Sequence, residues 1–235
     1  MFFWNPYYLL FMAPAFLLVM FAQMWVNNTY RKWSQVPNRL GLRGGEAAQR
    51  LLQNAGLSRV KLEATSGRLS DHYDPRSDVL RLSNGVANGQ SVASLAIAAH
   101  EIGHALQDRD NYGPLRFRAA LVPAVQIGSN LGWILIFAGL LLQGSFGSQL
   151  ATIGLLTFAM GTMFALATIP VEINASSRAK ALLRSSGLIT TQQEQDGVER
   201  VLRAAAFTYI AALAASLLQL LYYASLVAGI GRRRR

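Results

Sequence analysis

Long stretches without a charged side chain constrain the fold of this chain more than any other feature of its sequence. Lys, Arg, Asp and Glu are absent from residues 1–30, 119–171 and 204–231. About 20 apolar helical residues cross the hydrocarbon core of a bilayer, where every backbone polar group must be paired within the protein. The middle stretch is long enough for two crossings. We therefore predict four transmembrane helices, near residues 5–26, 120–142, 150–170 and 205–230.

Basic residues flank the apolar stretches and predict which side of the membrane each polar region faces. Loops rich in Lys and Arg stay in the cytoplasm, so we place the polar regions 27–118 and 171–203 there. The uncharged loop 143–149 is then expected on the opposite side. Four spans would also put the basic run Arg232–Arg235 outside, against the rule, which leaves the orientation of the fourth segment open. This placement accounts for the net charge of +10 without nucleic-acid binding.

The first polar region is expected to contain a small α+β element. Apolar spacing predicts a short helix over Glu46–Asn54, and alternating residues predict strands over 60–64 and 79–82. The polar residues 70–76 between the strands predict a turn. Ser91 is a helix cap for a further helix over 91–107.

The helix 91–107 carries the motif His100-Glu101-Ile102-Gly103-His104, which contains two of the chain's three histidines. Histidines four residues apart lie on one helical face, so both imidazoles can reach one zinc ion. Zinc lowers the pKa of a bound water to about 7, and Glu101 is placed to act as the general base. The chain has no cysteine, so further ligands must be His, carboxylate or water.

A third protein ligand is expected, and Glu172 is the leading candidate. It is the only acid between residues 111 and 193, and it follows Pro170 at the cytoplasmic end of the third span, where a carboxylate usually has a partner. A helix restarting at Pro170 would put Ser176 one turn further on. Glu172 could instead simply stabilise the first turn of that helix. The alternative ligands are His72, Glu194, Asp196 and Glu199.

The motif and the segment Pro170–Ser176 resemble the putative neutral zinc metallopeptidase family of bacterial membrane proteins, the YugP type. The arrangement is also similar to the gluzincin class and to HtpX-type membrane proteases. In those proteins a helix with E-x-x-A-D supplies the third ligand, which implies Glu172 here. Ser176 stands where those relatives have Asp, so a hydroxyl would hold a ligand histidine more weakly. Further similar segments are Trp4–Tyr7, Leu69–Arg76, Arg118–Pro123 and Ala204–Tyr209.

Other residues near the predicted site have either a catalytic or a purely structural interpretation. Zincins bind substrate as an added strand, so the strand near 79–83 is a candidate sheet edge. Residues that could bind substrate or stabilise an oxyanion are Asp71, His72, Tyr73, Tyr112 and Arg178.

We thus expect a mainly α, polytopic membrane protein with a zincin-like active-site helix beside a small α+β element. The expected parts are an anchor (1–26), a metallopeptidase region (27–118), two transmembrane helices (119–170), a ligand-bearing helix (171–203) and a fourth apolar helix with a basic tail (204–235).

The expected activity is that of a Zn²⁺ endopeptidase in the bacterial inner membrane. Its active site would face the cytoplasm and act on peptides or membrane proteins, as in membrane-protein quality control. The alternatives are a non-catalytic scaffold with a structural metal site, and a basic protein that binds anionic lipid headgroups.

Overall fold

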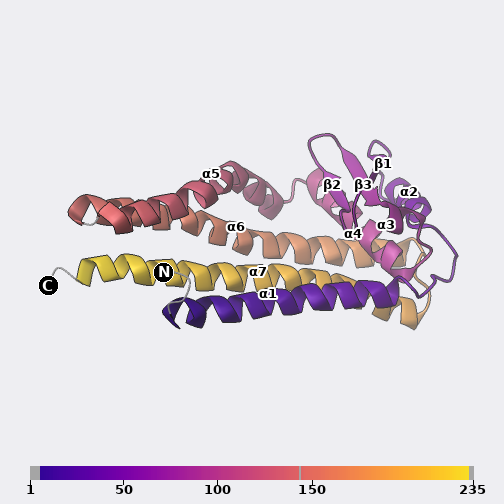
Figure 1. Ribbon diagram of the computed structural model, residues 1–235. Coiled ribbons are helices and arrows are strands. Elements are labelled where there is room, and N and C mark those ends of the chain that lie inside the picture. Colours follow the sequence, from indigo (N-terminus) through magenta and orange to yellow (C-terminus); the bar gives the residue numbers. More distant parts are fainter. Residues whose placement is uncertain (1–5, 143, 233–235) are drawn as a thin grey trace. The chain divides into compact units, whose positions relative to one another are not determined.

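The computed structural model describes residues 6–142 and 144–232, and four long helices account for most of them (Figure 1). Each of the four is long and apolar enough to cross a membrane. The predicted spans 120–142, 150–170 and 205–230 fall within these helices, and the span predicted over 5–26 does so from residue 6 on, since residue 5 lies outside the described residues. Every helix extends beyond the span predicted for it. The helices are α1 (Pro6–Trp33), α5 (Gly113–Leu142), α6 (Gly144–Ser185) and α7 (Gln192–Arg232).

Two predictions about α6 were wrong. The helix does not restart at Pro170 but runs through it. Helices that cross membranes tolerate proline, because neighbouring groups can pair with the backbone atoms that it leaves free. The predicted loop 143–149 is also much shorter, since α6 begins at Gly144. Gly144 has a φ of +64°, a conformation open to glycine, so the chain reverses within very few residues. Gln143 lies outside the described residues.

The chain divides into two compact units. The first comprises Met1–Ala22, Arg116–Ile169 and Thr208–Arg235, and the second comprises Gln23–Leu115 and Pro170–Phe207. In the first unit, α5 and α6 approach closely at Gly132 and Gly154, where a Cβ on either glycine would come within about 3 Å of the other helix. Small residues that let backbones meet are typical of helix contacts in membranes.

The second unit contains a three-stranded sheet of order β1-β3-β2. Strand β3 (Val79–Ser83) pairs in parallel with β1 (Lys61–Thr65) and antiparallel with β2 (His72–Asp74). The prediction that residues 79–83 form a sheet edge was therefore wrong: β3 is central, and its burial on both faces explains its weak alternation. The predicted turn at 70–76 contains β2, because the chain reverses only after Asp74.

Three shorter helices complete the second unit. They are α2 (Gly44–Asn54), α3 (Asn84–Asn88) and α4 (Val92–Arg109). The helices predicted over Glu46–Asn54 and 91–107 are confirmed: α2 begins two residues earlier, and α4 begins one residue later and ends two residues later. Ser91 caps α4, since its Oγ accepts a hydrogen bond from Ser94 N at 3.1 Å. Most residues of α4 are buried among α2, α3 and the sheet, which makes it the central element of this unit and fixes the side chains that it carries.

Candidate metal centre

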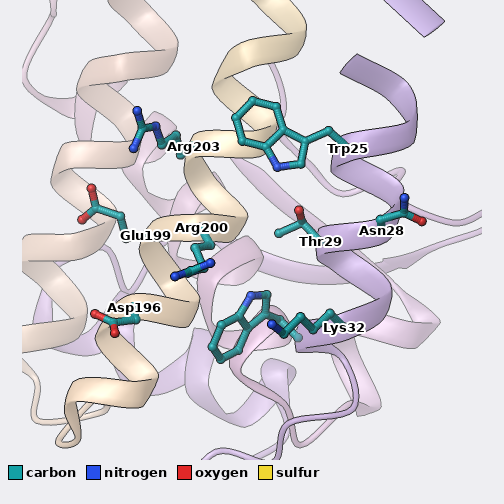
Figure 2. A pocket seen from close by; sticks show the side chains of 9 residues that line it. Trp25, Asn28, Thr29, Lys32, Asp196, Glu199, Arg200 and Arg203 are labelled. Atoms are coloured by element: carbon teal, nitrogen blue, oxygen red, sulfur yellow. The ribbon is translucent and has the colours of Figure 1, made fainter. Parts of the chain in front are cut away.

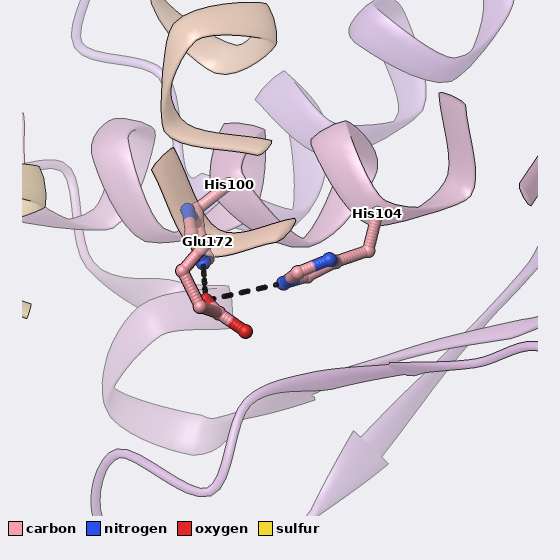
Figure 3. Close-up of side chains that lie close together, drawn as sticks. All are labelled: His100, His104 and Glu172. Carbon is pink, nitrogen blue, oxygen red and sulfur yellow. Dashed lines mark hydrogen bonds and ion pairs between the residues drawn. The ribbon is translucent and has the colours of Figure 1, made fainter. Parts of the chain in front are cut away.

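Three side chains from two helices converge in the second unit. His100 and His104 lie one turn apart on α4, with their rings 4.9 Å apart and nearly perpendicular. Glu172 comes from α6, and its Oε2 lies 3.2 Å from His100 Nε2 and 3.6 Å from His104 Nε2. Figure 3 shows the two imidazoles and the carboxylate turned toward one another. One donor atom from each residue lies within 4.8 Å of the other two.

The close approach of α4 and α6 depends on Gly103, the fourth residue of the motif. A Cβ at this position would lie 2.4 Å from the backbone oxygen of Ala175 on α6. Ala175 and Ala179 are fully buried, so small residues line the contact on both helices. A larger side chain at position 103 would push the helices apart and move Glu172 away from the histidines.

Gln107 fixes the orientation of His104, although its role is not apparent in the sequence alone. Its Nε2 donates to Val171 O at 2.7 Å, and a carbonyl can only accept, so the Oε1 of Gln107 must face His104 Nδ1 at 3.0 Å. His104 therefore carries its proton on Nδ1 and donates it to Gln107. This leaves the lone pair of His104 Nε2 directed toward Glu172.

Ser176 lies beside the other histidine. Its Oγ is 3.2 Å from His100 Nδ1, one helical turn beyond Glu172 on α6. When Nδ1 carries the proton, His100 donates it to the hydroxyl and its Nε2 is free to bind a metal. The structure thus brings Ser176 to the position expected for a group that orients a ligand histidine.

The electrostatics of the cluster favour a positive charge at its centre. The Glu172 side chain is only 3% exposed, and a buried carboxylate requires a cationic or hydrogen-bonded partner. Burial, the largest single influence, would lower the pKa of His104, but the contact with Glu172, the charges of Glu101 and Glu172 and the hydrogen bond with Gln107 together raise it. A lone pair on Nε2 would repel the carboxylate unless a cation lay between them. Two imidazole nitrogens and one carboxylate oxygen form a donor set that suits zinc.

Glu101 lies next to this cluster and is held by the sheet. Its Oε2 accepts a hydrogen bond from the backbone N–H of Tyr73 at 3.2 Å, which links α4 to β2. Burial raises the pKa of Glu101, although the neighbouring His100 and His104 oppose that rise. A carboxylate with a raised pKa is a better proton acceptor than an ordinary glutamate.

The hydroxyl of Tyr73 lies between two carboxylates, and neither of them is that of Glu101. The hydroxyl lies 2.9 Å from Asp78 Oδ1 and 3.1 Å from Asp108 Oδ2, and it can donate its single proton to only one of them at a time. Burial, together with these carboxylates, raises the pKa of Tyr73, so the phenol stays protonated. Its side chain thus anchors β2 to the end of α4.

Two further predicted residues before β3, Asp71 and the first residue of β2, His72, lie outside the cluster. Asp71 accepts hydrogen bonds from Ser83 N at 2.7 Å and from Ser83 Oγ at 3.0 Å, so it supports the sheet. His72 is exposed, and its Nδ1 donates to Ser70 O at 2.8 Å. Among the described residues, His72 is not part of the group that could hold a metal ion.

The alternative acidic ligands are also engaged elsewhere. Glu194 accepts hydrogen bonds from the backbone N–H groups of Arg39, Thr190 and Thr191 at 2.9–3.0 Å, which holds the start of α7. Asp196 accepts from Gln192, and Glu199 lies 3.5 Å from Lys180.

Tyr112 and Arg178 meet near the end of α4. The guanidinium of Arg178 lies 5.8 Å from the centre of the Tyr112 ring and forms an ion pair with Asp110. Its Nε donates a hydrogen bond to Asn174 Oδ1 at 2.8 Å. Hydrogen bonds from Arg178, which has the larger effect, and from Arg109 hold the pKa of the Asp110 carboxyl below its usual range. Asn174 Oδ1 also accepts from Gln107 Nε2 at 3.0 Å, so Arg178 is connected to His104 through two side chains.

Comparisons with known proteins bear on the family to which the chain belongs. Residues 8–228 match the model of the family described as "Putative neutral zinc metallopeptidase". The chain is 42% identical over 206 residues to "Putative membrane protease YugP" of Bacillus subtilis (strain 168), covering 88% of this chain and 90% of that protein. No solved structure matches the chain. The extent of the match, together with the sequence identity, shows that the chain belongs to the putative neutral zinc metallopeptidase family.

Proposed function

We propose that this protein is a zinc-dependent, membrane-bound endopeptidase in which His100, His104 and Glu172 hold the metal. The observation that carries the proposal is the convergence of these three donors within 4.8 Å, with Glu101 beside them on the same helix. A protein of the same family is named as a membrane protease, which supports the assignment to peptide hydrolysis. Zinc, when bound, supplies a Lewis acid that polarises a carbonyl and lowers the pKa of water.

Glu101 is the proposed general base. Its Oε2 accepts from Tyr73 N, whereas its Oε1 accepts no hydrogen bond from the described residues, so Oε1 is the atom available for a proton. It would take that proton from the attacking water and pass it to the leaving amine. Tyr73 has a positioning role, because its backbone N–H holds the Glu101 carboxylate in place.

The free edge of β2 is the proposed site for the peptide backbone. Strand β2 is at the edge of the sheet, and the N–H of Tyr73 points to Glu101 rather than to β3. An extended peptide that pairs along this edge would run past Glu101 and the three donors. Tyr112 and Arg178 are proposed to position the centre through Asn174 and Gln107, and the exposed His72 is a proposed substrate contact.

We further propose that the centre faces the cytoplasm at the inner membrane of a bacterium. The basic residues of the second unit flank the apolar helices, as cytoplasmic segments do. Peptide segments of membrane proteins that emerge at this face are the proposed substrates, which fits a role in membrane-protein quality control.

Metal content of the purified full chain tests the proposal. We expect about one zinc per chain in the wild type and roughly a tenfold lower content or less in His104→Ala and Glu172→Ala, because a catalytic site needs three protein ligands. His72→Ala is the matched control, since it removes the remaining histidine and should retain the metal. Full zinc occupancy in Glu172→Ala would contradict the ligand set. Loss of zinc in His72→Ala would move the site elsewhere.

A further inference from the structure

A second polar site lies between α1 and α7, away from the three metal-binding donors. It is a cavity of about 600 Å³ lined by nine residues of the second unit (Figure 2). Helix α1 contributes Trp25, Asn28, Thr29, Lys32 and Trp33, and α7 contributes Asp196, Glu199, Arg200 and Arg203. We call it the basic pocket.

The lining residues on each helix of the basic pocket are spaced as in a helix–helix contact, but they are not the apolar residues that such contacts contain. The residues on α7 are spaced at i, i+3, i+4 and i+7, and those from Trp25 to Lys32 on α1 have the same spacing. Helices normally bury apolar side chains at these positions. Here the facing stripes are mostly polar or charged, so the two helices enclose a polar space instead of a packed interface.

Trp33, one of the lining residues, packs against α7 at Gly197. A Cβ on Gly197 would lie 2.5 Å from two ring atoms of Trp33, so the glycine allows the indole to pack flat against α7. The side chain of Trp33 is buried, with only 6% of the residue exposed. A buried indole therefore forms part of the lining, and the cavity does not depend on exposed side chains alone.

The charges around the pocket leave two guanidinium groups without a partner. Arg200 and Arg203 are exposed, and among the described residues neither has an ion pair or a hydrogen bond from its side chain. Of the two acids, Glu199 forms an ion pair at 3.5 Å with Lys180, which is not one of the lining residues. The negative charge of Glu199 is thus partly neutralised. Three cations face two carboxylates, and the excess charge favours an anionic ligand.

The position of the pocket along its helices indicates where that anion comes from. The first charged residue of α1, Arg31, lies six residues after Trp25, and the charge-free stretch of α7 begins directly after Arg203. Trp25 and Lys32 are seven residues apart, about 10 Å along the helix axis. A bilayer's polar layer is roughly 5–7 Å thick on each side, and tryptophan is enriched at its boundary. The pocket therefore begins where the polar headgroups of a membrane would lie.

From these observations we infer that the basic pocket binds the headgroup of an anionic phospholipid. The phosphate is held by Arg200 and Arg203 with Lys32 across from them, and Trp25 lies toward the acyl chains. This inference rests on the membrane helices and the pocket, not on the metal centre, so it stands or falls independently of peptidase activity.

Titration of the full chain with phosphatidylglycerol in micelles of an uncharged detergent tests the inference, with bound lipid counted by native mass spectrometry. Each basic residue near an anionic lipid contributes about a fivefold change in affinity. Arg200→Gln combined with Arg203→Gln should therefore weaken phosphatidylglycerol binding about 25-fold. The control Arg50→Gln with Arg184→Gln removes two exposed charges outside the pocket and should stay within about twofold of the wild type.

Asp196→Asn is a second test variant, and damage to the fold could not produce the result expected for it. Removal of this carboxylate from the lining should strengthen phosphatidylglycerol binding about fivefold. Phosphatidylcholine that binds as tightly as phosphatidylglycerol would overturn the inference, as would unchanged binding in the double arginine variant. Competition by glycerol 3-phosphate at equal concentration would show a site for a soluble phosphate and would also overturn the lipid assignment.

Discussion

The proposed metal centre and the basic pocket are both polar clusters between two helices, but they hold their polar atoms in different ways. At the metal centre the Nδ1 atoms of both histidines lie within hydrogen-bond distance of a protein oxygen, and Glu172 is almost fully buried. In the basic pocket Arg200 and Arg203 are exposed, with no such partners among the described residues.

This difference fits the two proposals, a small ion held at fixed positions and a larger group that exchanges. Fixed donors bind a metal strongly because no side chain has to be ordered when the ion arrives. Exposed arginines lose rotamer freedom on binding, but they adapt to ligands of different shape. Substitutions at the metal centre should therefore have large effects, and substitutions in the pocket should have small ones.

Replacement of Glu101 by Gln is expected to have the largest effect. The amide keeps an oxygen for the N–H of Tyr73 but cannot take a proton, and a general base contributes about 10²–10⁴-fold to the rate. Peptide hydrolysis should fall by that factor while zinc content stays at the wild-type level. Hydrolysis within tenfold of the wild type would contradict the assigned role.

Gln107→Leu should weaken zinc binding by about 10–100-fold, because it removes the acceptor that holds His104 Nδ1 and the donor to Val171 O. Competition with a chelator of known affinity measures the change. Gln53→Leu on α2 is the matched control, since Gln53 is exposed and away from the site. Equal zinc affinity in Gln107→Leu and the control would show that the hydrogen bond does not position the histidine.

Much of the metal centre could be predicted from the sequence because its signals are local. His100 and His104 are one helical turn apart, and Glu172 stands out as a single acid in a long segment without acids. Gln107 was missed because its partners on α6 are 64 and 67 residues away. Its one local signal is its position three residues after His104.

The sheet and the basic pocket show why the remainder could not be predicted. Strand β2 has only three residues and ends at an Asp-Pro pair that is typical of turns. The order of strands depends on pairing across a hairpin, so β3 appeared as an edge although it is central. The arginines of α7 were interpreted as markers of topology, since no sequence pattern identifies α1 as the facing helix.

Gly103→Ala should destabilise the chain by about 1–2 kcal/mol, because the new Cβ meets Ala175 O and outweighs the better helix propensity of alanine. Gly161→Ala is the matched control on α6, where nothing lies within 4 Å of the added Cβ, and it should stabilise by up to about 1 kcal/mol. Thermal unfolding in detergent measures both. Opposite shifts support the close contact of α4 with α6, whereas two stabilised variants would refute it.

The smallest effect is expected for zinc binding when Arg200 and Arg203 are both changed to Gln. Neither side chain contacts the three donors or Gln107 among the described residues, so zinc affinity should remain within about twofold and stability within about 0.5 kcal/mol of the wild type. The chelator competition used for Gln107→Leu measures the first quantity. A tenfold loss of zinc affinity would mean that α7 is coupled to the metal centre, and the two clusters would then have to be treated as one site.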